Sequence, residues 1–310
     1  MTSSTTRPRR FQRRWLPLIG ALLILASAGA MPASAVVSYP RSAPIILQNV
    51  SIMDILANRG HICHSTFTHV MKNFSDVTNA RNYMNAAQAC GLKVIAYFSA
   101  TVNTTLGTVY PARVASWVNI VKNHPNLWGY VTVKEPSWTR INALEIRLLY
   151  RTFKAADPNH PVMVLFGDVP HFGMTANPYT PNMADVVMLD WYPVETAYGG
   201  RSRYGTSYVA TGPTHFKRIR AYVALKTPGT PIWLMVATHR NLNPAAHKKQ
   251  RPTQALLYRQ VREGFGYLRA SGIAFHTWQN TLYQLDERRD ATMVSWMRGL
   301  AAKVQAGTFQ

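Results

Sequence analysis

The stretch LWGYVTVKEPSW, residues 127–138, joins an apolar run to a Lys-Glu-Pro sequence. The run from Leu127 to Val133 is nearly continuous rather than alternating, as in a parallel strand that is buried on both faces. Pro136 disfavours helix at the residue before it, so we expect Glu135 to be extended. The stretch therefore predicts a buried parallel strand that carries a carboxylate at its C-terminal end.

Seven other apolar runs have a similar character, at residues 43–50, 69–74, 93–98, 161–166, 185–189, 231–237 and 273–278. Helical patterns separate several of them, at residues 78–89, 114–121, 141–155, 214–225, 254–270 and 290–304. Eight strands that alternate with helices predict one α/β domain over residues 36–310, a (β/α)8 TIM barrel of the usual size of about 250 residues. A doubly wound open sheet is the alternative, but no Gly-rich phosphate-binding turn follows an early strand.

Residues 1–35 are predicted to be a signal peptide that precedes this domain. Five arginines come before the apolar run at residues 16–30, and residues 33–35, Ala-Ser-Ala, fit a cleavage site. The paired arginines lack the full twin-arginine pattern, so we expect export by the Sec route and a secreted protein. An uncleaved membrane anchor is the alternative, although Pro17 and Pro32 interrupt the run.

The charge balance is strongly basic, with 34 Lys and Arg residues against 13 Asp and Glu residues. Removal of the five arginines in residues 1–35 leaves a net charge of +16 (29 − 13). Such a field attracts polyanions, among them acidic polysaccharide, cell wall and nucleic acid. The basic residues are scattered, which favours a solvated surface, and no recognised nucleic-acid-binding module is present. Scarce carboxylates would also suit a protein secreted into acidic surroundings.

The two cysteines, Cys63 and Cys90, lie before a predicted strand and at the end of the following helix. Export would allow a disulfide between them, and two free buried thiols are the alternative. Two isolated cysteines do not suggest a metal site, and His61, His64 and His69 lack the spacing of a zinc helix. We therefore expect no metal and no cofactor.

Acidic residues at the strand ends are the candidates for chemistry, because the active site of a TIM barrel lies at the C-terminal ends of its strands. Sequence position places seven of the thirteen in helices, turns or caps, namely Asp76, Glu145, Asp157, Asp185, Glu263, Glu287 and Asp290. Six can reach the barrel mouth: Asp54, Glu135, Asp168, Asp190, Glu195 and Asp286.

The sequence GYVTVKEPS at residues 129–137 resembles the acid/base motif of the TIM-barrel glycoside hydrolase superfamily related to cellulases and mannanases. The stretches DVVMLDWYPV at residues 185–194 and FHTWQN at residues 275–280 also resemble that family. The resemblance implies a glycosidase in which Glu135 is the acid/base residue and Trp278 is a platform for stacking a sugar ring.

Two features depart from the family pattern. Lys134 replaces the usual Asn or Asp before the glutamate, and the seventh strand ends in Thr238 and His239 where the nucleophilic glutamate is expected. These departures keep open the alternative of a catalytically inactive TIM barrel that binds carbohydrate or a cell surface.

The chemistry of glycoside cleavage identifies the partner that Glu135 needs. One carboxyl group must be protonated and a second ionised, at about 5 Å for retention and roughly 6.5–9.5 Å for inversion. Asp190 is the first candidate for the second group, as base or stabiliser, and Asp168 is the next. Two strand positions separate Glu135 from Asp190, which favours the wider, inverting spacing.

We therefore expect a secreted glycoside hydrolase that cleaves an extracellular polysaccharide or oligosaccharide, with Glu135 and Asp190 as catalytic residues. Further substrate contacts are expected from residues near strand ends: Lys134, Trp138, Asp168, Tyr192, His239 and Trp278. A structural role for Glu135, in a salt bridge with Lys134 or Arg140, is the alternative. The sequence leaves the sugar, its linkage and the oligomeric state open.

Overall fold

The computed structural model describes residues 37–38, 43–136, 139–167, 178–191, 195–196, 208–238, 248–249, 252–278 and 290–309. All of these residues belong to one unit of the chain, Val36–Gln310. The predicted signal peptide, residues 1–35, lies outside the described residues.

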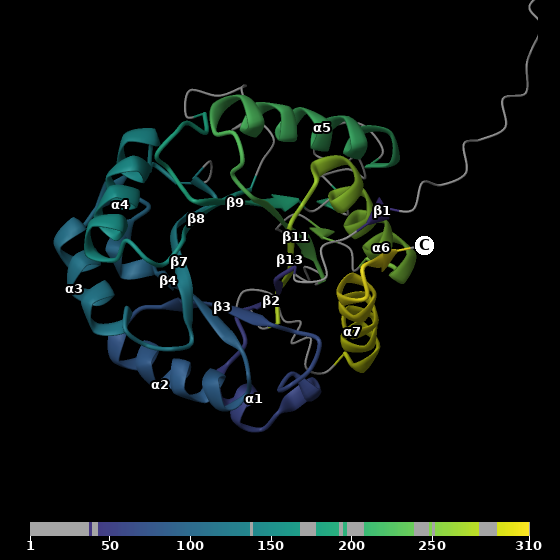
Figure 1. Ribbon diagram of the computed structural model, residues 1–310, viewed down its shortest axis with the longest axis horizontal. Helices are drawn as coiled ribbons and strands as arrows, with labels where there is room; N and C mark the ends of the chain where they lie inside the picture. The colour runs from purple at the N-terminus through teal and green to yellow at the C-terminus, as the bar shows by residue number, and fades with distance from the viewer. Residues whose placement is uncertain are drawn as a thin grey trace, which may run out of the picture. The chain divides into compact units, whose positions relative to one another are not determined.

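Eight parallel strands of the described chain close into a barrel, and helices surround it (Figure 1). Around the ring the strands are β2 (Ile45–Gln48), β3 (His69–Phe74), β4 (Lys93–Phe98), β7 (Leu127–Lys134), β8 (Val162–Phe166), β9 (Val186–Trp191), β11 (Ile232–Ala237) and β13 (Gly272–His276). Each predicted apolar run overlaps one of them. The TIM barrel is thus confirmed, and the open doubly wound sheet is excluded.

Six of the described helices coincide with the predicted patterns, and α1 was not predicted. They are α1 (Ile52–Leu56), α2 (Val77–Ala89), α3 (Pro111–Val121), α4 (Ala143–Ala156), α5 (Tyr208–Lys226), α6 (Gln254–Glu263) and α7 (Ala291–Gln305), with short helical turns at Arg59–His61, Ser99–Thr101 and Gly264–Leu268. Acidic side chains stabilise three of the helix starts, as predicted for Asp76 and Asp290 but not for Glu145. Asp76 and Asp290 accept backbone N–H bonds at the starts of α2 and α7, and Glu145 completes a capping box at α4.

Three antiparallel pairs of two-residue strands were not predicted. They are β1 (Val37–Ser38) with β14 (Thr308–Phe309), β5 (Val102–Asn103) with β6 (Thr108–Val109), and β10 (Glu195–Thr196) with β12 (Lys248–Lys249). Two residues are too few to show a period in the sequence.

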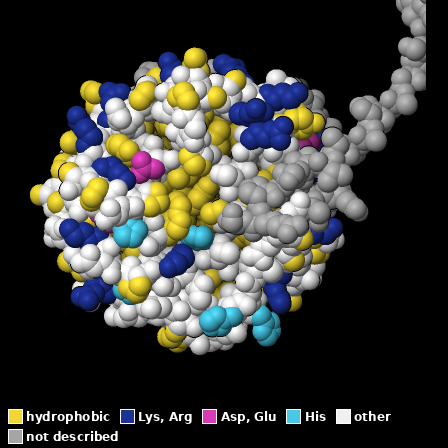
Figure 2. Space-filling model, viewed as in Figure 1, with side chains coloured by type: hydrophobic (Ala, Val, Ile, Leu, Met, Phe, Trp, Pro, Cys, Tyr) yellow, Lys and Arg dark blue, Asp and Glu magenta, His cyan; other side chains and the backbone are white. Residues whose placement is uncertain are grey.

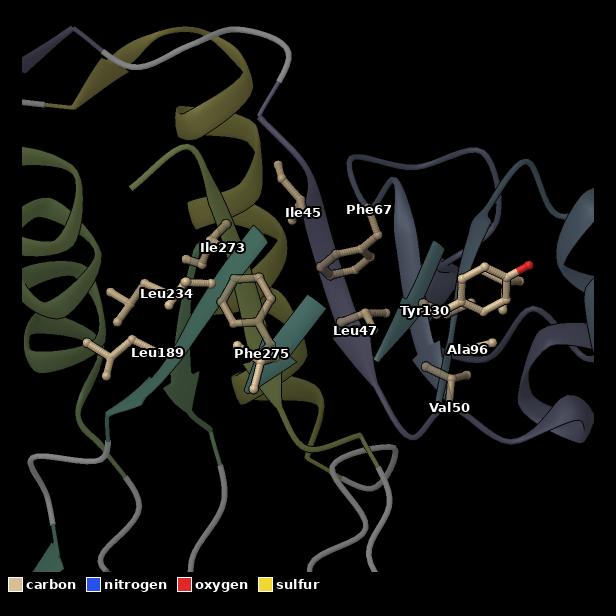
Figure 3. Packing of buried hydrophobic residues seen from close by; sticks show 14 of the residues in the cluster. Ile45, Leu47, Val50, Phe67, Ala96, Tyr130, Leu189, Leu234, Ile273 and Phe275 are labelled. Carbon is tan, nitrogen blue, oxygen red and sulfur yellow. The ribbon is translucent and has the colours of Figure 1, made fainter. Parts of the chain in front are cut away.

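Alternation along the barrel strands separates two apolar layers. The outer layer packs against the helices, and Figure 3 shows part of it, with Ile45 and Leu47 from β2 and Ile273 and Phe275 from β13. The inner layer fills the barrel itself, with Ile46, Met71, Ile95, Tyr97, Val131, Met163, Leu165, Val186, Met188, Trp233, Met235 and Ala274. Since this interior is packed, a ligand can reach only the inward positions that follow it at the C-terminal strand ends.

Cys63 and Cys90 form a disulfide, with their Cα atoms 4.4 Å apart. The bond joins the segment before β3 to the residue that caps the C-terminus of α2. Of the two alternatives that the sequence leaves open, the structure therefore shows the disulfide.

The surface carries basic side chains without a single basic patch on the face that Figure 2 shows. Lys and Arg side chains lie apart around the edge of this face, and acidic side chains are few. The distribution fits the solvated basic surface favoured by the sequence. Among the described helices, none combines the length and the apolar character needed to span a membrane.

Candidate active site

The barrel mouth is formed by the inward positions that follow the inner apolar layer. Gln48 comes two residues after Ile46, and Asp190 comes two residues after Met188, so both side chains face the barrel axis. The same step along β3 and β13 reaches Asn73 and His276. We define the mouth layer as these four residues together with Lys134, which ends β7, and Tyr97, the inner-layer residue whose ring lies 5.7 Å from Lys134 Nζ. Its described members are Gln48, Asn73, Tyr97, Lys134, Asp190 and His276.

Glu135 follows the last residue of β7 and adopts a left-handed backbone conformation, with φ of 48°. The expectation of an extended residue before Pro136 is therefore wrong. The backbone N–H of Glu135 donates to the Leu165 carbonyl over 2.7 Å, and the register of β7 against β8 shifts between Val131 and Lys134. We attribute the conformation to this tertiary pairing, which overrides the local preference, and it costs about 1–2 kcal/mol for a residue with a side chain.

The side chain of Glu135 lies over the end of β8. A Cβ atom built on Gly167 would come within 2.8 Å of Glu135 Oε1 and 2.9 Å of its Cγ, so a larger residue there would require the Glu135 side chain to shift. The residue is half-buried, and neither Lys134 nor Arg140 forms a direct ion pair with it in the described part of the chain. The salt-bridge alternative for Glu135 is therefore not observed.

Lys134 connects the candidate carboxylates electrostatically. Its Nζ atom lies 5.7 Å from the centre of the Tyr97 ring. Burial lowers the pKa of Lys134 below its ordinary value, while the carboxylates of Glu135 and Asp190 oppose that shift. The ammonium group is therefore close enough to interact with both carboxylates, which places these three predicted site residues together.

Two further members of the mouth layer are almost fully buried. Asp190 is 4% exposed, so its carboxylate lies deeper than that of Glu135. Tyr97 is 7% exposed, and burial raises the pKa of its phenol to about 12. Tyr97 is consequently neutral at physiological pH and can donate a hydrogen bond.

Gln48 was not predicted, and it is an unusual member of the mouth layer. The residue is 1% exposed, and neither its amide nitrogen nor its amide oxygen has a hydrogen-bond partner in the structure as described. A buried polar group without a partner costs about 1–3 kcal/mol, which makes this amide a candidate contact for a polar ligand.

Replacing Gln48 by methionine is expected to raise the free energy of unfolding by about 1–3 kcal/mol, because the variant removes this unsatisfied amide at similar volume. Urea denaturation measures the change. Gln260 is a matched control, since it is also 1% exposed with an unsatisfied amide but lies in α6. Gln260→Met should stabilise the fold similarly, whereas only Gln48→Met should weaken ligand binding at the mouth. Equal binding by both variants would exclude Gln48 from the site.

Trp278 does not lie where a sugar-stacking platform would be. Its side chain has no exposed surface, packs against Gly60, and donates from the indole nitrogen to Asp54 over 3.3 Å. The expected stacking role is therefore wrong for this structure. Because β13 ends at His276, the strand alternation that turns Ala274 inward does not extend to Trp278, which belongs to the outer layer with Phe275.

Asp54 also has a structural role, although it was among the six acids that could reach the mouth. It is fully buried, accepts a hydrogen bond from Ser51 Oγ at 2.8 Å and lies 3.6 Å from Arg59 Nε. The other predicted contacts Trp138, Asp168, Tyr192 and His239 lie outside the described residues, as does Asp286. The described part of the chain has no cluster of three or more His, Cys, Asp or Glu residues that could hold a metal ion.

Comparison with known proteins relates the chain to others through its fold. No family model matches the sequence, and no curated protein matches it. A GH5_18 protein from Streptomyces cattleya, solved in complex with GlcNAc, has a TM-score of 0.60 at 13% identity, over 86% of this chain and 82% of that one. A family 1 β-glucosidase from Thermotoga maritima has a TM-score of 0.56 at 7% identity, over 88% of this chain and all of the other.

A third structure is the GH2 β-galacturonidase from Eisenbergiella tayi, bound to galacturonate, with a TM-score of 0.55 at 12% identity. The match covers 81% of this chain but only 46% of the galacturonidase. All three are glycoside hydrolases built on TIM barrels. At these identities the similarity establishes the fold. The barrel is thus of a kind that glycoside hydrolases share.

Proposed function

We propose that this protein is a secreted glycoside hydrolase that cleaves an extracellular polysaccharide or oligosaccharide. The observation that carries the proposal is the pair of carboxylates at the barrel mouth, since Glu135 and Asp190 both interact with the ammonium group of Lys134. The fold shared with glycoside hydrolases supports the same conclusion.

The two carboxylates suit different steps. Glu135 is half-buried and can exchange its proton with solvent, so it is the general acid that protonates the leaving oxygen. Asp190 is buried within electrostatic reach of the Lys134 ammonium group, and we assign it the role of the base that activates water. Strand seven ends in Thr238 and His239 where the usual nucleophile is expected, and the Thr238 hydroxyl donates to the His276 carbonyl over 3.0 Å. An inverting reaction fits this arrangement better than a retaining one.

A catalytically inactive carbohydrate-binding barrel is the second candidate function. Thr238 favours it, because a hydroxyl group that bonds to the backbone cannot replace a nucleophilic carboxylate. Lys134 favours it too, because this residue stands where the hydrolases that the motif resembles have Asn or Asp. In this case the mouth layer would bind sugar without cleaving it.

Secretion and a preference for acidic polysaccharide belong to the same proposal. The presequence at residues 1–35 and the Cys63–Cys90 disulfide support export. The net charge of +16 that remains without the presequence (29 − 13) supports an acidic glycan as partner. The twin-arginine route and an uncleaved anchor stay alternatives.

The test is reducing-sugar release from a panel of neutral and acidic polysaccharides between about pH 4 and pH 8. The wild-type protein and Glu135→Gln are compared under the same conditions. Release by the wild type alone would identify a glycosidase and its substrate class. Binding of one polysaccharide by both proteins, with no release by either, would instead support the inactive barrel.

A further inference from the structure

Lys134 has a combination of features that glycoside cleavage does not require. The side chain leaves the last residue of β7 at the barrel mouth and lies over the Tyr97 ring. It retains some exposed surface, so a small molecule that enters the mouth can reach it. Two carboxylates, those of Glu135 and Asp190, lie within electrostatic reach.

The chemistry of a lysine depends on its surroundings. An amine attacks a carbonyl carbon only in its neutral form, and burial in a barrel increases the neutral fraction. Burial does lower the pKa of Lys134, despite the opposing carboxylates. Attack on a carbonyl also needs an acid and a base nearby to move protons, and the neighbouring carboxylates meet that need.

We propose that Lys134 forms a Schiff base with a small hydroxyaldehyde or hydroxyketone, such as a short open-chain sugar, that enters the barrel mouth. The reaction does not depend on the proposed glycosidase activity, because it needs only the amine, the carbonyl compound and a proton shuttle.

The step balances without an oxidant or a second reactant. The lone pair of Lys134 Nζ forms a bond to the carbonyl carbon, and the C=O π electrons move to oxygen. A nitrogen-bound proton passes to that oxygen through a carboxylate and gives the carbinolamine. A protonated carboxyl group, which we assign to Glu135, then donates to the hydroxyl group, and one water leaves as the C=N bond forms.

The rest of the mouth layer suits a ligand that carries hydroxyl groups. Gln48 has a buried amide that lacks hydrogen-bond partners within the described ranges, and Asn73 presents an exposed amide at the end of β3. The neutral phenol of Tyr97 adds a donor. These groups favour hydroxyaldehydes and hydroxyketones over purely apolar carbonyl compounds.

Two other lysines provide internal controls. Lys72 also has a pKa lowered by burial, but it faces outward from β3, 5.9 Å from the ring of Tyr83 in α2. Lys93 is exposed at the start of β4, where its Nζ donates to the Pro125 carbonyl over 2.9 Å. Lys72 therefore tests whether a lowered pKa alone suffices, and Lys93 reports ordinary surface reactivity.

The experiment treats the wild-type protein with glycolaldehyde and sodium cyanoborohydride near neutral pH, where the hydride fixes any imine as a secondary amine. Peptide mass spectrometry then measures the rate of modification at each lysine. We expect Lys134 to react at least about tenfold faster than Lys93 and faster than Lys72, with a rate that saturates as glycolaldehyde increases. A rate at Lys134 equal to or below that at Lys93, or a pattern in which Lys72 leads, would overturn the proposal.

A variant links the reaction to the mouth layer. Gln48→Met should slow the modification of Lys134 and leave Lys93 unchanged, whereas the matched Gln260→Met should leave both unchanged. Equal rates at Lys134 in all three proteins would contradict a bound hydroxyaldehyde. Since no glycoside is present, failure here is distinct from failure to release reducing sugar.

Discussion

Glu135→Gln is expected to lower kcat by about 10²–10⁴-fold on any glycoside that the wild-type protein cleaves. The amide retains the shape of the side chain but cannot donate a proton to the leaving oxygen. Sugar binding should persist, because the mouth layer is otherwise unchanged. Steady-state kinetics and calorimetric titration with the same substrate measure the two effects. A kcat within a few-fold of the wild-type value would exclude Glu135 as the general acid.

The variant Glu135→Gly distinguishes the catalytic role of the carboxyl group from the backbone strain at the same residue. Activity should fall as in Glu135→Gln, while the free energy of unfolding should rise by up to about 1 kcal/mol, because glycine adopts a positive φ without steric cost. Urea denaturation of both variants measures the difference, with Glu135→Gln as the control that retains a side chain. A glycine variant less stable than the glutamine variant would contradict strain at this residue.

His69 is expected to make the fold sensitive to acid. Its ring lies at the other end of the barrel interior, 8% exposed, with Trp128 and Trp233 packed edge-on against it. Nδ1 is 2.7 Å from Thr68 Oγ1, and Nε2 has no partner among the residues described. Burial lowers the pKa of His69 to about 4, and the nearby Lys93 ammonium contributes in the same direction.

The direction of this pH dependence follows from which state of the protein binds the proton more tightly. Between the unfolded pKa of 6.5 and the folded pKa of about 4, the unfolded chain binds the proton more tightly, so stability falls as the pH falls. At about 1.4 kcal/mol per pKa unit, the full loss is about 3 kcal/mol, and it ends near pH 4. Urea denaturation at intervals between pH 4 and pH 7 measures it.

His69→Phe retains an aromatic ring and removes the titration, so this contribution to the pH dependence should disappear. The matched control is His61→Asn, which removes an exposed histidine at a residue with φ of 52°, a conformation that asparagine tolerates. That variant should keep the wild-type pH dependence. If His69→Phe also kept it, another group would be responsible. If the fold loses about 3 kcal/mol of stability in acid, the protein is poorly suited to acidic surroundings. Such surroundings would then not explain why carboxylates are scarce in this sequence.

The barrel could be predicted from the sequence because each of its strands is a continuous apolar run. Because these strands are apolar on both faces, the sequence did not show which of their side chains face into the barrel. Trp278 was expected at the mouth from the family resemblance, whereas β13 ends at His276 and Trp278 belongs to the outer layer. Gln48 was missed because it continues an apolar run and resembles no motif. Counting in steps of two from Ile46 would have found Gln48, but the same count from Ala274 reaches both His276 and Trp278 and would not have excluded the tryptophan.

The conformation of Glu135 could not be predicted from local sequence. The Pro136 rule concerns neighbouring atoms, whereas the left-handed backbone goes with a hydrogen bond to Leu165, thirty residues away, and a register shift in β7. The start of α5 likewise could not be predicted from local sequence. We expected the helix to begin after Pro213, and it begins at Tyr208. Tertiary pairing accounts for the Glu135 conformation.

The close approach of Glu135 to Gly167 has a consequence for how this barrel can diverge. Since a Cβ at residue 167 would come within 2.8 Å of Glu135 Oε1, a change at one position affects the other. A descendant with alanine at 167 would need a shifted Glu135 side chain, a shorter acid at 135 or a displaced end of β7 to keep a carboxylate at the mouth. Among relatives of this chain the two residues should therefore covary, so that a large residue at 167 marks a barrel in which the acid has moved or disappeared.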